Sequence, residues 1–455
     1  MTHEVINIIY AILALLCALI MTLKSKTDHK IIAFLISFWI LGESVVSLDM
    51  FSINLPALGG DLQLKRIVIL SLTGYLGFIS LVKFRTFQKS ERIPYEKFLF
   101  AFTIWFLIVI VYHLFDGMLN GKQFVVLFQG ILSLFIPYLV LKKYADDDMI
   151  RIFFKAFLLI GIITSLVAII QFFIDPQFMR VGRTTIAFAG RLRSQGIFWS
   201  EYQHSYLLAF AIALVLVAIQ SKRLKIFLIS LFLIGIILSF HRMSWIATFL
   251  VFIVYVVMEK RTKIWKLMLT SGILLFTFYV LSTEVIPIID EFTQSPIYQS
   301  RLSSDTITNR LKFYEMVINN INKIYLWGAG STSNSLYYYG MLSTGVVDEK
   351  WAQGETGGIH NLYLEILFFY GIPLLVLFCL MLFSMLRDYF RLFRSRHKIF
   401  LFSFLFLGIY CLMNLTNSFS IYSDFTFILG IMLGCTAAVH RKQLYSGEII
   451  IKDLR

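Results

Sequence analysis

Three residues of this sequence have the chemical character of a reaction centre: Arg242, Arg310 and His360. Each lies where an apolar stretch meets a polar loop, and a charged or titratable group is costly there unless it has a function. The planar fork of a guanidinium group donates paired, charge-assisted hydrogen bonds, which suit a diphosphate. A neutral imidazole accepts a proton from a hydroxyl group without the burial of a permanent charge. The three together predict diphosphate binding and proton removal from a hydroxyl group, although singly Arg310 also suits a solvated surface and His360 a helix cap.

Further polar and aromatic residues accompany these three positions. Arginines recur in the polar stretch 175–203, which ends soon after Arg193-Ser194-Gln195-Gly196-Ile197-Phe198. A group of tyrosines and a tryptophan follows residue 330 and ends at Tyr363; it fits either an interfacial aromatic belt or rings that stack on sugars. We expect these residues to bind substrate: Arg180, Arg191, Arg193, Asn361 and Tyr363.

Other motifs exclude several kinds of site. The four cysteines lie in apolar runs without the spacing of metal ligands. There is no carboxylate pair of the glycosidase kind, no DxD-like cluster and no G-x-S-x-G elbow. The turn Gly328-Ala329-Gly330-Ser331 follows no strand, so a Rossmann or P-loop site is excluded and helix termination is the better interpretation. We expect neither a metal nor a cofactor.

The elements that hold these residues must lie in a membrane. The chain of 455 residues is 58% hydrophobic and 15% charged, and its mean hydropathy is +0.78. Soluble proteins carry about 25% charged residues. The net charge of +14 is accounted for by membrane topology, so no nucleic-acid partner is expected. No basic region precedes the first apolar run, and no cleavable signal is expected.

Apolar runs of about 20 residues are the predicted membrane spans. They lie at residues 5–23, 31–48, 67–82, 98–115, 123–141, 152–173, 204–220, 226–240, 244–258, 267–283, 361–386, 399–416 and 425–439. The count is thirteen, with twelve as the alternative, because the short runs within 226–258 also suit a re-entrant pair. With the amino terminus outside and the carboxyl terminus inside, the inner loops carry most of the 41 Lys and Arg. The predicted fold is an all-α polytopic membrane protein, a single integral membrane domain over residues 1–455.

Two outer loops, at residues 175–203 and 284–360, interrupt this regular pattern. The second contains an amphipathic segment from Thr308 to Ile324 that has helical periodicity but is too polar to span. We expect this segment to roof the active site. Ser239 to Trp245 form a tight outer turn between the two loops, and Pro373 should kink the span that contains it.

Several motifs, taken in chain order, resemble the O-antigen ligase and polymerase superfamily. One is Ser-x-x-Arg at the turn before a span, from Ser239 to Arg242. Others are Asn-Arg at Arg310, an amphipathic helix that ends in Trp-Gly-x-Gly, and Gly-x-His-Asn-x-Tyr-Leu-x-x-Leu-x-x-x-Gly, which ends at Gly371. The Arg193-x-x-Gly-x-Phe segment resembles the signature of the other outer loop. The resemblance covers roughly residues 150–440, and it departs from the family at His241, where a small polar residue is usual, and in a span count one larger than the twelve common among the ligases.

The resemblance implies a GT-C-like glycosyltransferase that works without a metal, inverts the anomeric carbon and uses a glycan on undecaprenyl diphosphate as donor. Arg242 and Arg310 would hold the diphosphate and stabilise charge on the leaving group. His360 would accept the proton of the attacking sugar hydroxyl, or orient that hydroxyl. The site would face the periplasm or exterior from the bacterial cytoplasmic membrane.

The resemblance leaves the acceptor open. A polysaccharide polymerase, which extends a lipid-linked repeat unit, is favoured by two arginine-bearing outer loops and by the spacing from Arg180 to Gly196. A ligase that delivers the glycan to lipid A core or another acceptor is the alternative. A transporter or flippase is a third possibility, but no internal repeat or broken helix is evident. The expected partners are an undecaprenyl-diphosphate-linked oligosaccharide, the lipid bilayer, and a chain-length regulator and flippase of the same pathway.

Overall fold

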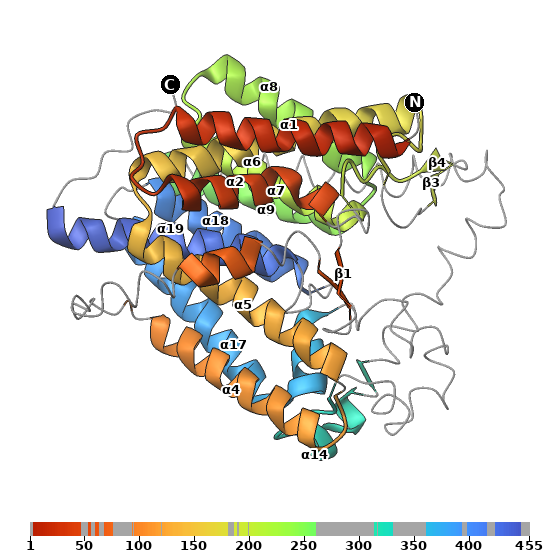
Figure 1. The fold of residues 1–455 in the computed structure, drawn as a ribbon, viewed down its shortest axis with the longest axis vertical. Coiled ribbons are helices and arrows are strands. Elements are labelled where there is room, and N and C mark those ends of the chain that lie inside the picture. Colours follow the sequence, from red (N-terminus) through yellow and green to blue (C-terminus); the bar gives the residue numbers. More distant parts are fainter. Residues whose placement is uncertain are drawn as a thin grey trace.

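The computed structural model describes residues 3–46, 53–55, 60–62, 68–75, 93, 95–119, 121–180, 186–188, 191–198, 200–260, 314–315, 317–330, 361–393, 398–415 and 424–446. Its labelled helices (Figure 1) are α1 (His3–Leu23), α2 (Lys30–Val46), α4 (Glu96–Phe115), α5 (Gly121–Tyr144), α6 (Asp147–Phe173), α7 (Glu201–Ala218), α8 (Lys222–Leu238), α9 (Arg242–Lys260), α14 (Ile321–Ile324), α17 (Leu362–Phe393), α18 (Lys398–Met413) and α19 (Asp424–Ser446). Residues 68–75 are helical as well. Two short antiparallel ribbons pair β1 (Ile53–Leu55) with β2 (Gly60–Leu62), and β3 (Ile186–Phe188) with β4 (Arg191–Leu192). The prediction of an all-α polytopic membrane protein is confirmed, and the ribbons, which were not predicted, are small additions to its loops.

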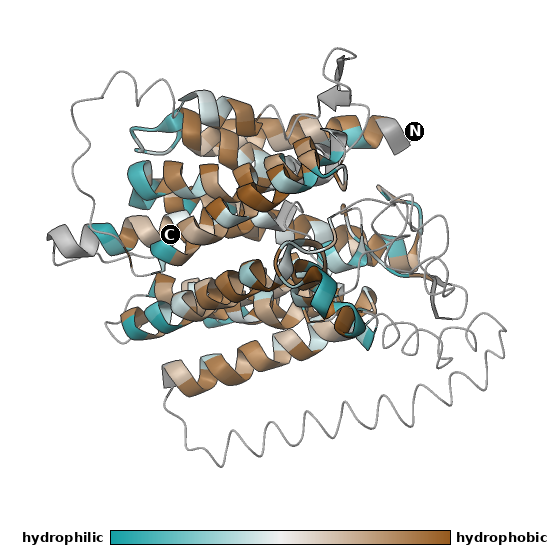
Figure 2. Cartoon of the chain, turned by 90° about the horizontal axis from the view of Figure 1, so that it is seen from below, coloured by the Kyte–Doolittle hydropathy of each residue, from teal (hydrophilic) through white to brown (hydrophobic). Residues whose placement is uncertain are grey.

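The helices have the length and composition of membrane spans. Among the described residues, six are long and apolar enough to cross a membrane: Val5–Leu23, Glu96–Phe115, Gln123–Tyr144, Asp147–Phe173, Glu201–Ala218 and Leu362–Phe393. Shorter apolar helices lie at Lys30–Gly42, Met243–Met258, Lys398–Met413 and Thr426–Arg441. Brown, hydrophobic ribbon accordingly dominates the bundle in Figure 2. The predicted span at 267–283 lies outside the described residues.

The region 226–258, where a re-entrant pair was the alternative, contains the two separate helices α8 and α9. They have 17 and 19 residues, or about 25 and 28 Å at the rise of an α-helix. The hydrocarbon core of a bilayer is about 30 Å thick. Both helices fall slightly short of this thickness, and the number of spans in this region stays a prediction.

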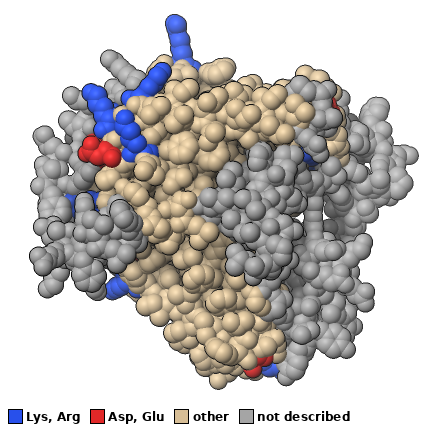
Figure 3. All heavy atoms as spheres, viewed as in Figure 1, with Lys and Arg blue, Asp and Glu red and all other residues tan. Residues whose placement is uncertain are grey.

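The helices alternate between two ends of the bundle, which lie at the left and right of Figure 1. We call the end at which α2, α6 and α8 begin the inner end, and the end at which α7 and α9 begin the outer end, following the predicted topology. The inner end is tied together by Lys26 N, which donates to Asp148 Oδ2 at 3.2 Å, and by Arg441 Nη2, which donates to Lys143 O at 2.9 Å. Lys and Arg gather at the same end in Figure 3, as the positive-inside prediction expects. The side of the membrane on which each end lies stays a prediction.

Helix α7 is enclosed by the other helices and positions the outer end. It packs against α6, α8, α9 and α18, and its apolar stretch of alanine, leucine and valine is buried. Its first turns are buried too, although they contain Glu201, His204 and Ser205. Polar side chains that are buried need hydrogen-bond partners, and the loops around the start of α7 supply them.

Helices α4, α5 and α17 lie below α6 to α9 in Figure 1, and α19 packs closely on α5. A Cβ atom on Gly430 would lie 2.4 Å from Leu134 O, and one on Gly434 would lie 2.7 Å from Leu141 Cβ. Small residues four positions apart permit such close approach of two helices in a membrane. These helices carry the second half of the outer end.

Candidate functional site

Arg242 is the first residue of α9, and the turn before it is anchored to α7. Ser239 Oγ donates to Ile236 O at 2.6 Å, and the backbone N–H of His241 donates to Ser239 Oγ at 3.3 Å. The imidazole Nδ1 of His241 lies 2.5 Å from Ser244 Oγ and 3.2 Å from Ser205 Oγ of α7. Ser244 Oγ donates to Ser205 Oγ at 2.7 Å. The backbone that carries Arg242 is therefore fixed on α7, while the Arg242 side chain is outside what the structure describes.

Two tyrosines of α7 enclose the same imidazole. The rings of Tyr202 and Tyr206 lie edge-on to that of His241, with centroids 5.3 and 5.4 Å away. His241 is only 7% exposed. This side chain is thus a buried, hydrogen-bonded part of the outer end, and it directly precedes Arg242, the residue predicted to bind the diphosphate.

The end of the first outer loop lies in a crevice beside this turn. Ser194 donates through its backbone N–H to Leu238 O at 3.1 Å and through Oγ to Ala168 O at 2.9 Å. The buried side chain of Gln171 accepts from the N–H groups of Gln195 and Gly196, both at 3.0 Å. Gly196 has φ +59°, and a Cβ there would lie 1.9 Å from Thr164 Oγ1. The loop is therefore held by α6 and α8 at the start of α9.

The predicted substrate-binding arginines of this loop have different surroundings. Arg180 donates to Pro176 O, Gln195 Oε1 and Arg193 O at 2.6, 3.0 and 2.8 Å. Burial lowers the pKa of the Arg180 guanidinium below its usual value, and the nearby Glu201 carboxylate offsets only part of this effect. These bonds show that Arg180 shapes the loop, whereas its contact with substrate stays a prediction.

Arg193 has more free bonding capacity than Arg180. Its Nη1 lies 3.4 Å from Glu201 Oε1. Its Nε is buried and has no hydrogen-bond partner among the described residues, and its contact with substrate stays a prediction. Arg191 begins β4, and its side chain is outside the described part of the structure.

The start of α17, beside His360, is bonded to the end of α18. Asn361 Nδ2 donates to Leu415 O at 3.0 Å, and Asn361 Oδ1 caps the helix by accepting from Leu364 N at 3.0 Å. Tyr363 Oη donates to Cys411 O at 3.1 Å. Both predicted substrate-binding residues therefore have structural bonds, while His360 itself lies outside the described residues.

A short chain of contacts joins this region to the Arg242 turn. Tyr206, which touches His241, donates through Oη to Met413 O at 3.2 Å. The next residue, Asn414, accepts through its backbone O from Leu362 N at 2.9 Å. The structure thus brings the α8–α9 turn, the start of α7 and the start of α17 to one outer end.

Helix α17 is broken, which corrects the expectation that no broken helix is present. The break is at Gly371, with φ 85° and ψ 172°, a conformation that glycine adopts readily. The predicted kink of this span is confirmed, and it lies two residues before Pro373. In a continuous helix the Pro373 ring would clash with the carbonyl of Phe369, four residues earlier. The rings of Tyr363 and Phe378 are only 6.0 Å apart, although a straight helix would separate them by about 22 Å. The first nine residues of α17 therefore form a separate crosspiece at the outer end.

The turn after α14 fills the break. Unpaired backbone groups within a membrane are tolerated only where other protein groups satisfy them. Three backbone hydrogen bonds do so here: Ala329 N to Phe368 O at 2.7 Å, Gly330 N to Phe369 O at 3.3 Å and Ile372 N to Tyr325 O at 2.9 Å. The second outer loop is therefore attached to α17 through the main chain.

The glycines of this turn are required by close approach. Gly328 has φ +79° and its N–H bonds to Ile324 O at 3.0 Å, so it ends the helix as predicted. A Cβ on Gly328 would also lie 2.3 Å from the carbonyl carbon of Phe369, and one on Gly371 would lie 2.5 Å from Leu326 O. The turn therefore ends one helix and docks on another.

Trp327 fixes the turn against α4. Its ring stacks on Tyr112 and Trp105, with centroids 4.6 and 5.5 Å away, and His113 Nε2 lies 2.8 Å from Trp327 O. The described part of the predicted helix before it, residues 314–315 and 317–324, buries Val317 and Ile324 but leaves Ile318 59% exposed. Arg310, which precedes this part of the segment, lies outside the described residues.

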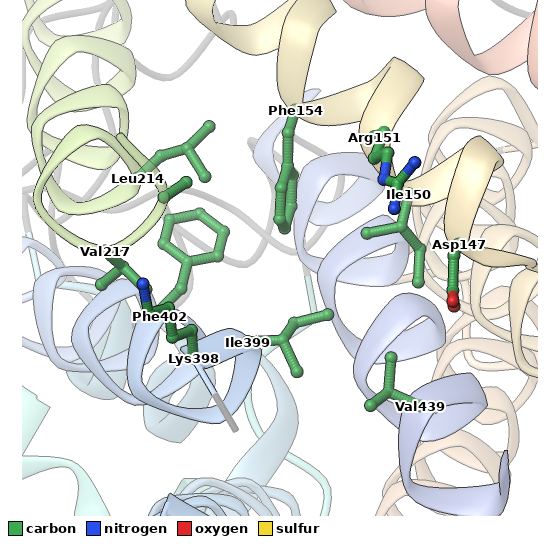
Figure 4. A pocket seen from close by; sticks show the side chains of 11 residues that line it. Asp147, Ile150, Arg151, Phe154, Leu214, Val217, Lys398, Ile399, Phe402 and Val439 are labelled. Carbon is green, nitrogen blue, oxygen red and sulfur yellow. The ribbon is translucent and has the colours of Figure 1, made fainter. Parts of the chain in front are cut away.

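A pocket at the inner end is separate from these residues (Figure 4). Phe154 of α6 and Phe402 of α18 form part of its apolar wall, and Asp147, Arg151 and Lys398 are its charged residues. It lies at the opposite end of the helices from Arg242. Among the described residues no group of His, Cys, Asp and Glu could hold a metal ion, and the expectation of a metal-free reaction stays a prediction.

Comparison with known families adds the decisive observation. Residues 226–379 match the family model described as O-Antigen ligase. This match supports membership of the O-antigen ligase and polymerase superfamily. No curated protein matches the chain.

The match to the superfamily model is shorter than the predicted resemblance, which began near residue 150. It includes α8, α9, the second outer loop and the broken part of α17, and thus Arg242, Arg310 and His360. The superfamily implies a glycosyltransferase-like enzyme that acts on lipid-linked oligosaccharide in a membrane. The individual roles of the three residues stay predictions.

Sequence reasoning missed several buried polar residues of the outer end. Ser205, His241 and Ser244 bond to one another, and Gln171 holds the first loop. The available signal was a polar side chain within a predicted span or directly before Arg242. That signal does not show which side chains meet, because the partners on different elements are 24 to 39 residues apart in the sequence.

Proposed function

We propose that this protein is a polysaccharide polymerase that transfers an undecaprenyl-diphosphate-linked glycan onto a lipid-linked repeat unit at the outer face of the cytoplasmic membrane. The observation that carries the proposal is the convergence of three segments at one end of the bundle. These are the turn that begins with Arg242, the Arg193 segment, and the start of α17 beside His360. The family match spans the first and third of them.

The reaction is a single displacement that inverts the anomeric carbon. A hydroxyl oxygen of the acceptor sugar forms the new bond to that carbon, the bond to the diphosphate oxygen breaks, and the diphosphate leaves with the electron pair. Arg242 and Arg310 bind the diphosphate and stabilise its developing charge. His360 accepts the proton of the attacking hydroxyl. No metal ion is required in this proposal.

The remaining outer residues bind the glycan and its carrier. Arg193 offers its buried Nε, and Arg180 holds Arg193 O and Gln195 in place. Arg191 adds positive charge, and Asn361 and Tyr363 fix the crosspiece next to His360. These assignments agree with a lipid diphosphate that enters at the outer membrane boundary.

A ligase of the same superfamily is the second candidate, because the matching family model is described as O-Antigen ligase. The two activities differ in acceptor. A polymerase forms a longer glycan on the lipid carrier, whereas a ligase moves the glycan to lipid A core or another acceptor. The product therefore distinguishes them.

The test uses the protein in membrane vesicles with its lipid-linked repeat unit, and measures glycan length on the carrier. His360→Ala should leave only single repeats, and Arg242→Lys and Arg310→Lys should each reduce the rate roughly a hundredfold. Arg223→Lys, an exposed arginine at the inner end, is the matched control and should act normally. Long chains from His360→Ala would remove its role, and activity lost in chelator but restored by a divalent ion would remove the metal-free claim.

A further inference from the structure

His241 is the most unusual side chain near the candidate site. It stands directly before Arg242, where the resemblance leads us to expect a small polar residue. A large imidazole in this position has to be accommodated by neighbouring elements. The structure shows how this happens, because His241 is buried between Tyr202, Tyr206 and two serines.

The hydrogen bonds around His241 connect three points of the backbone. Ser205 belongs to α7 and donates through Oγ to Tyr202 O at 3.1 Å. Ser244 belongs to the first turn of α9 and donates to Ser205 Oγ at 2.7 Å. The imidazole Nδ1 lies within reach of both hydroxyl groups, at 3.2 and 2.5 Å. Loss of the ring would leave two buried hydroxyl groups with fewer partners, at the point where α9 begins.

Arg242 lies between the two residues of α9 and its turn that make these bonds. Its neighbour His241 is bonded on one side, and Ser244 is bonded two residues later. The Cα atom of Arg242 therefore cannot shift relative to α7 without a change in this hydrogen-bond network. A guanidinium group that makes two hydrogen bonds needs an accurately fixed backbone, since binding and catalysis depend on the placement of the charged group to within about 0.5 Å.

We propose that His241 is a positioning residue for Arg242: through Ser205 and Ser244 it fixes the first turn of α9 on α7, and so sets where the guanidinium meets the substrate diphosphate. This inference rests on the proposed function, because the proposed function assigns diphosphate binding to Arg242. It assigns no proton transfer to His241. His241 acts only through Arg242.

A double-mutant cycle tests this dependence. The purified protein is titrated with farnesyl diphosphate, an isoprenoid diphosphate that reports binding even in inactive variants. His241→Ala should weaken binding roughly 5- to 50-fold with Arg242 present. In the Arg242→Ala background the same change should alter binding less than about twofold. Ser244→Ala should behave in the same way, and His241→Asn should recover part of the loss because its amide can occupy the position of Nδ1.

His204→Ala is the matched control. His204 is also a buried histidine of the outer end, but it bonds to Thr164 Oγ1 and Gly235 O, on the side of α7 that faces α6 and α8. Its effect should be the same with and without Arg242. Thermal unfolding of every variant in detergent identifies losses that arise from misfolding.

The outcomes separate the two proposals. If His241→Ala weakens binding by the same factor in both backgrounds, the positioning role is wrong while diphosphate binding stands. If Arg242→Ala binds farnesyl diphosphate like the wild type, or the wild type does not bind it, the proposed role of Arg242 is wrong and the positioning role falls with it. If His241→Ala unfolds the protein, Ser244→Ala and His241→Asn decide by the same cycle.

Discussion

Two attachments hold the outer end together, and they use different chemistry. The α7–α9 attachment is made by side chains, the hydroxyl and imidazole groups of Ser205, His241 and Ser244. The attachment of the glycine turn to α17 is made by the main chain, with Ala329 N bonded to Phe368 O. The first attachment lies directly beside Arg242, and the second joins the segment that follows Arg310 to the helix that follows His360. The difference between side-chain and main-chain bonding determines which attachment tolerates a residue substitution.

A side-chain network adjusts when one member is replaced, because rotamers change and another polar group can take a vacant position. A main-chain attachment has no such freedom, since the two backbone segments lie so close together that no Cβ atom fits at Gly328 or Gly371. The glycine turn therefore acts as an all-or-none support for the second outer loop. The serine–histidine network instead determines the finer placement of α9.

The largest effect is expected from Gly371→Ala. A Cβ would lie 2.5 Å from Leu326 O, and the backbone conformation at φ 85° and ψ 172° is adopted almost only by glycine, so alanine there costs about 1–3 kcal/mol before the contact itself is counted. We expect loss of polymer formation and the lowest unfolding temperature among these variants.

Gly408→Ala in α18 is the control for Gly371→Ala, because nothing lies within 4 Å of a Cβ there. Alanine in a helix interior is favoured over glycine by roughly 0.5–1 kcal/mol. This variant should be as stable as the wild type or more so. Equal unfolding temperatures for the two alanine variants would break the distinction between the two attachments.

The next largest effect is expected from Gln171→Leu, beside the side-chain attachment. Gln171 is 1% exposed and accepts from two backbone N–H groups at 3.0 Å. Each buried donor left unpaired costs about 1–3 kcal/mol. We expect a lower unfolding temperature and faster proteolysis within residues 175–203. Gln177 is an exposed residue of the same loop, so Gln177→Leu should change neither the unfolding temperature nor the rate of proteolysis. Equal proteolytic sensitivity of the two variants would show that Gln171 does not hold the first outer loop.

The positions of the spans could be predicted from the sequence, because membrane burial leaves a local pattern of apolar length. The helix end at Gly328 and the kink from Pro373 were also predictable, since both depend on the residue's own backbone chemistry. The docking of the glycine turn on α17 was not. Its partners Ala329 and Phe368 lie far apart in the sequence, and main-chain bonds leave no residue-type signal at either partner.

The candidate site shows the same division. The chemistry of Arg242 could be proposed from residue type and its place before a span. The partners of His241 could not, because Ser205 lies 36 residues earlier, in a run that otherwise predicts a plain apolar helix. Sequence identifies groups that are costly to bury, whereas the fold determines which of them satisfy one another.

A smaller effect is expected from Trp327→Leu, which leaves the backbone bonds of the glycine turn in place. The variant loses two aromatic stacks, on Trp105 and Tyr112, each worth about 0.5–1.5 kcal/mol beyond burial. Trp327→Phe keeps a stacking ring and should recover most of the stability in thermal unfolding. A loss as large as that of Gly371→Ala would mean that the ring, and not the main chain, holds the turn.

The smallest effect is expected from Glu201→Gln, at the edge of the side-chain attachment. Arg193 Nη1 is 3.4 Å from Glu201 Oε1, and the Arg193 side chain is 27% exposed, so solvent screens the pair. Partly exposed pairs contribute up to about 1 kcal/mol. Wild-type stability should therefore fall with added salt slightly more than that of the variant. Since glutamine keeps the shape but not the charge, a loss as large as that of Gln171→Leu would show that charge holds the first loop. The contrast would then lie between an ionic and a main-chain attachment.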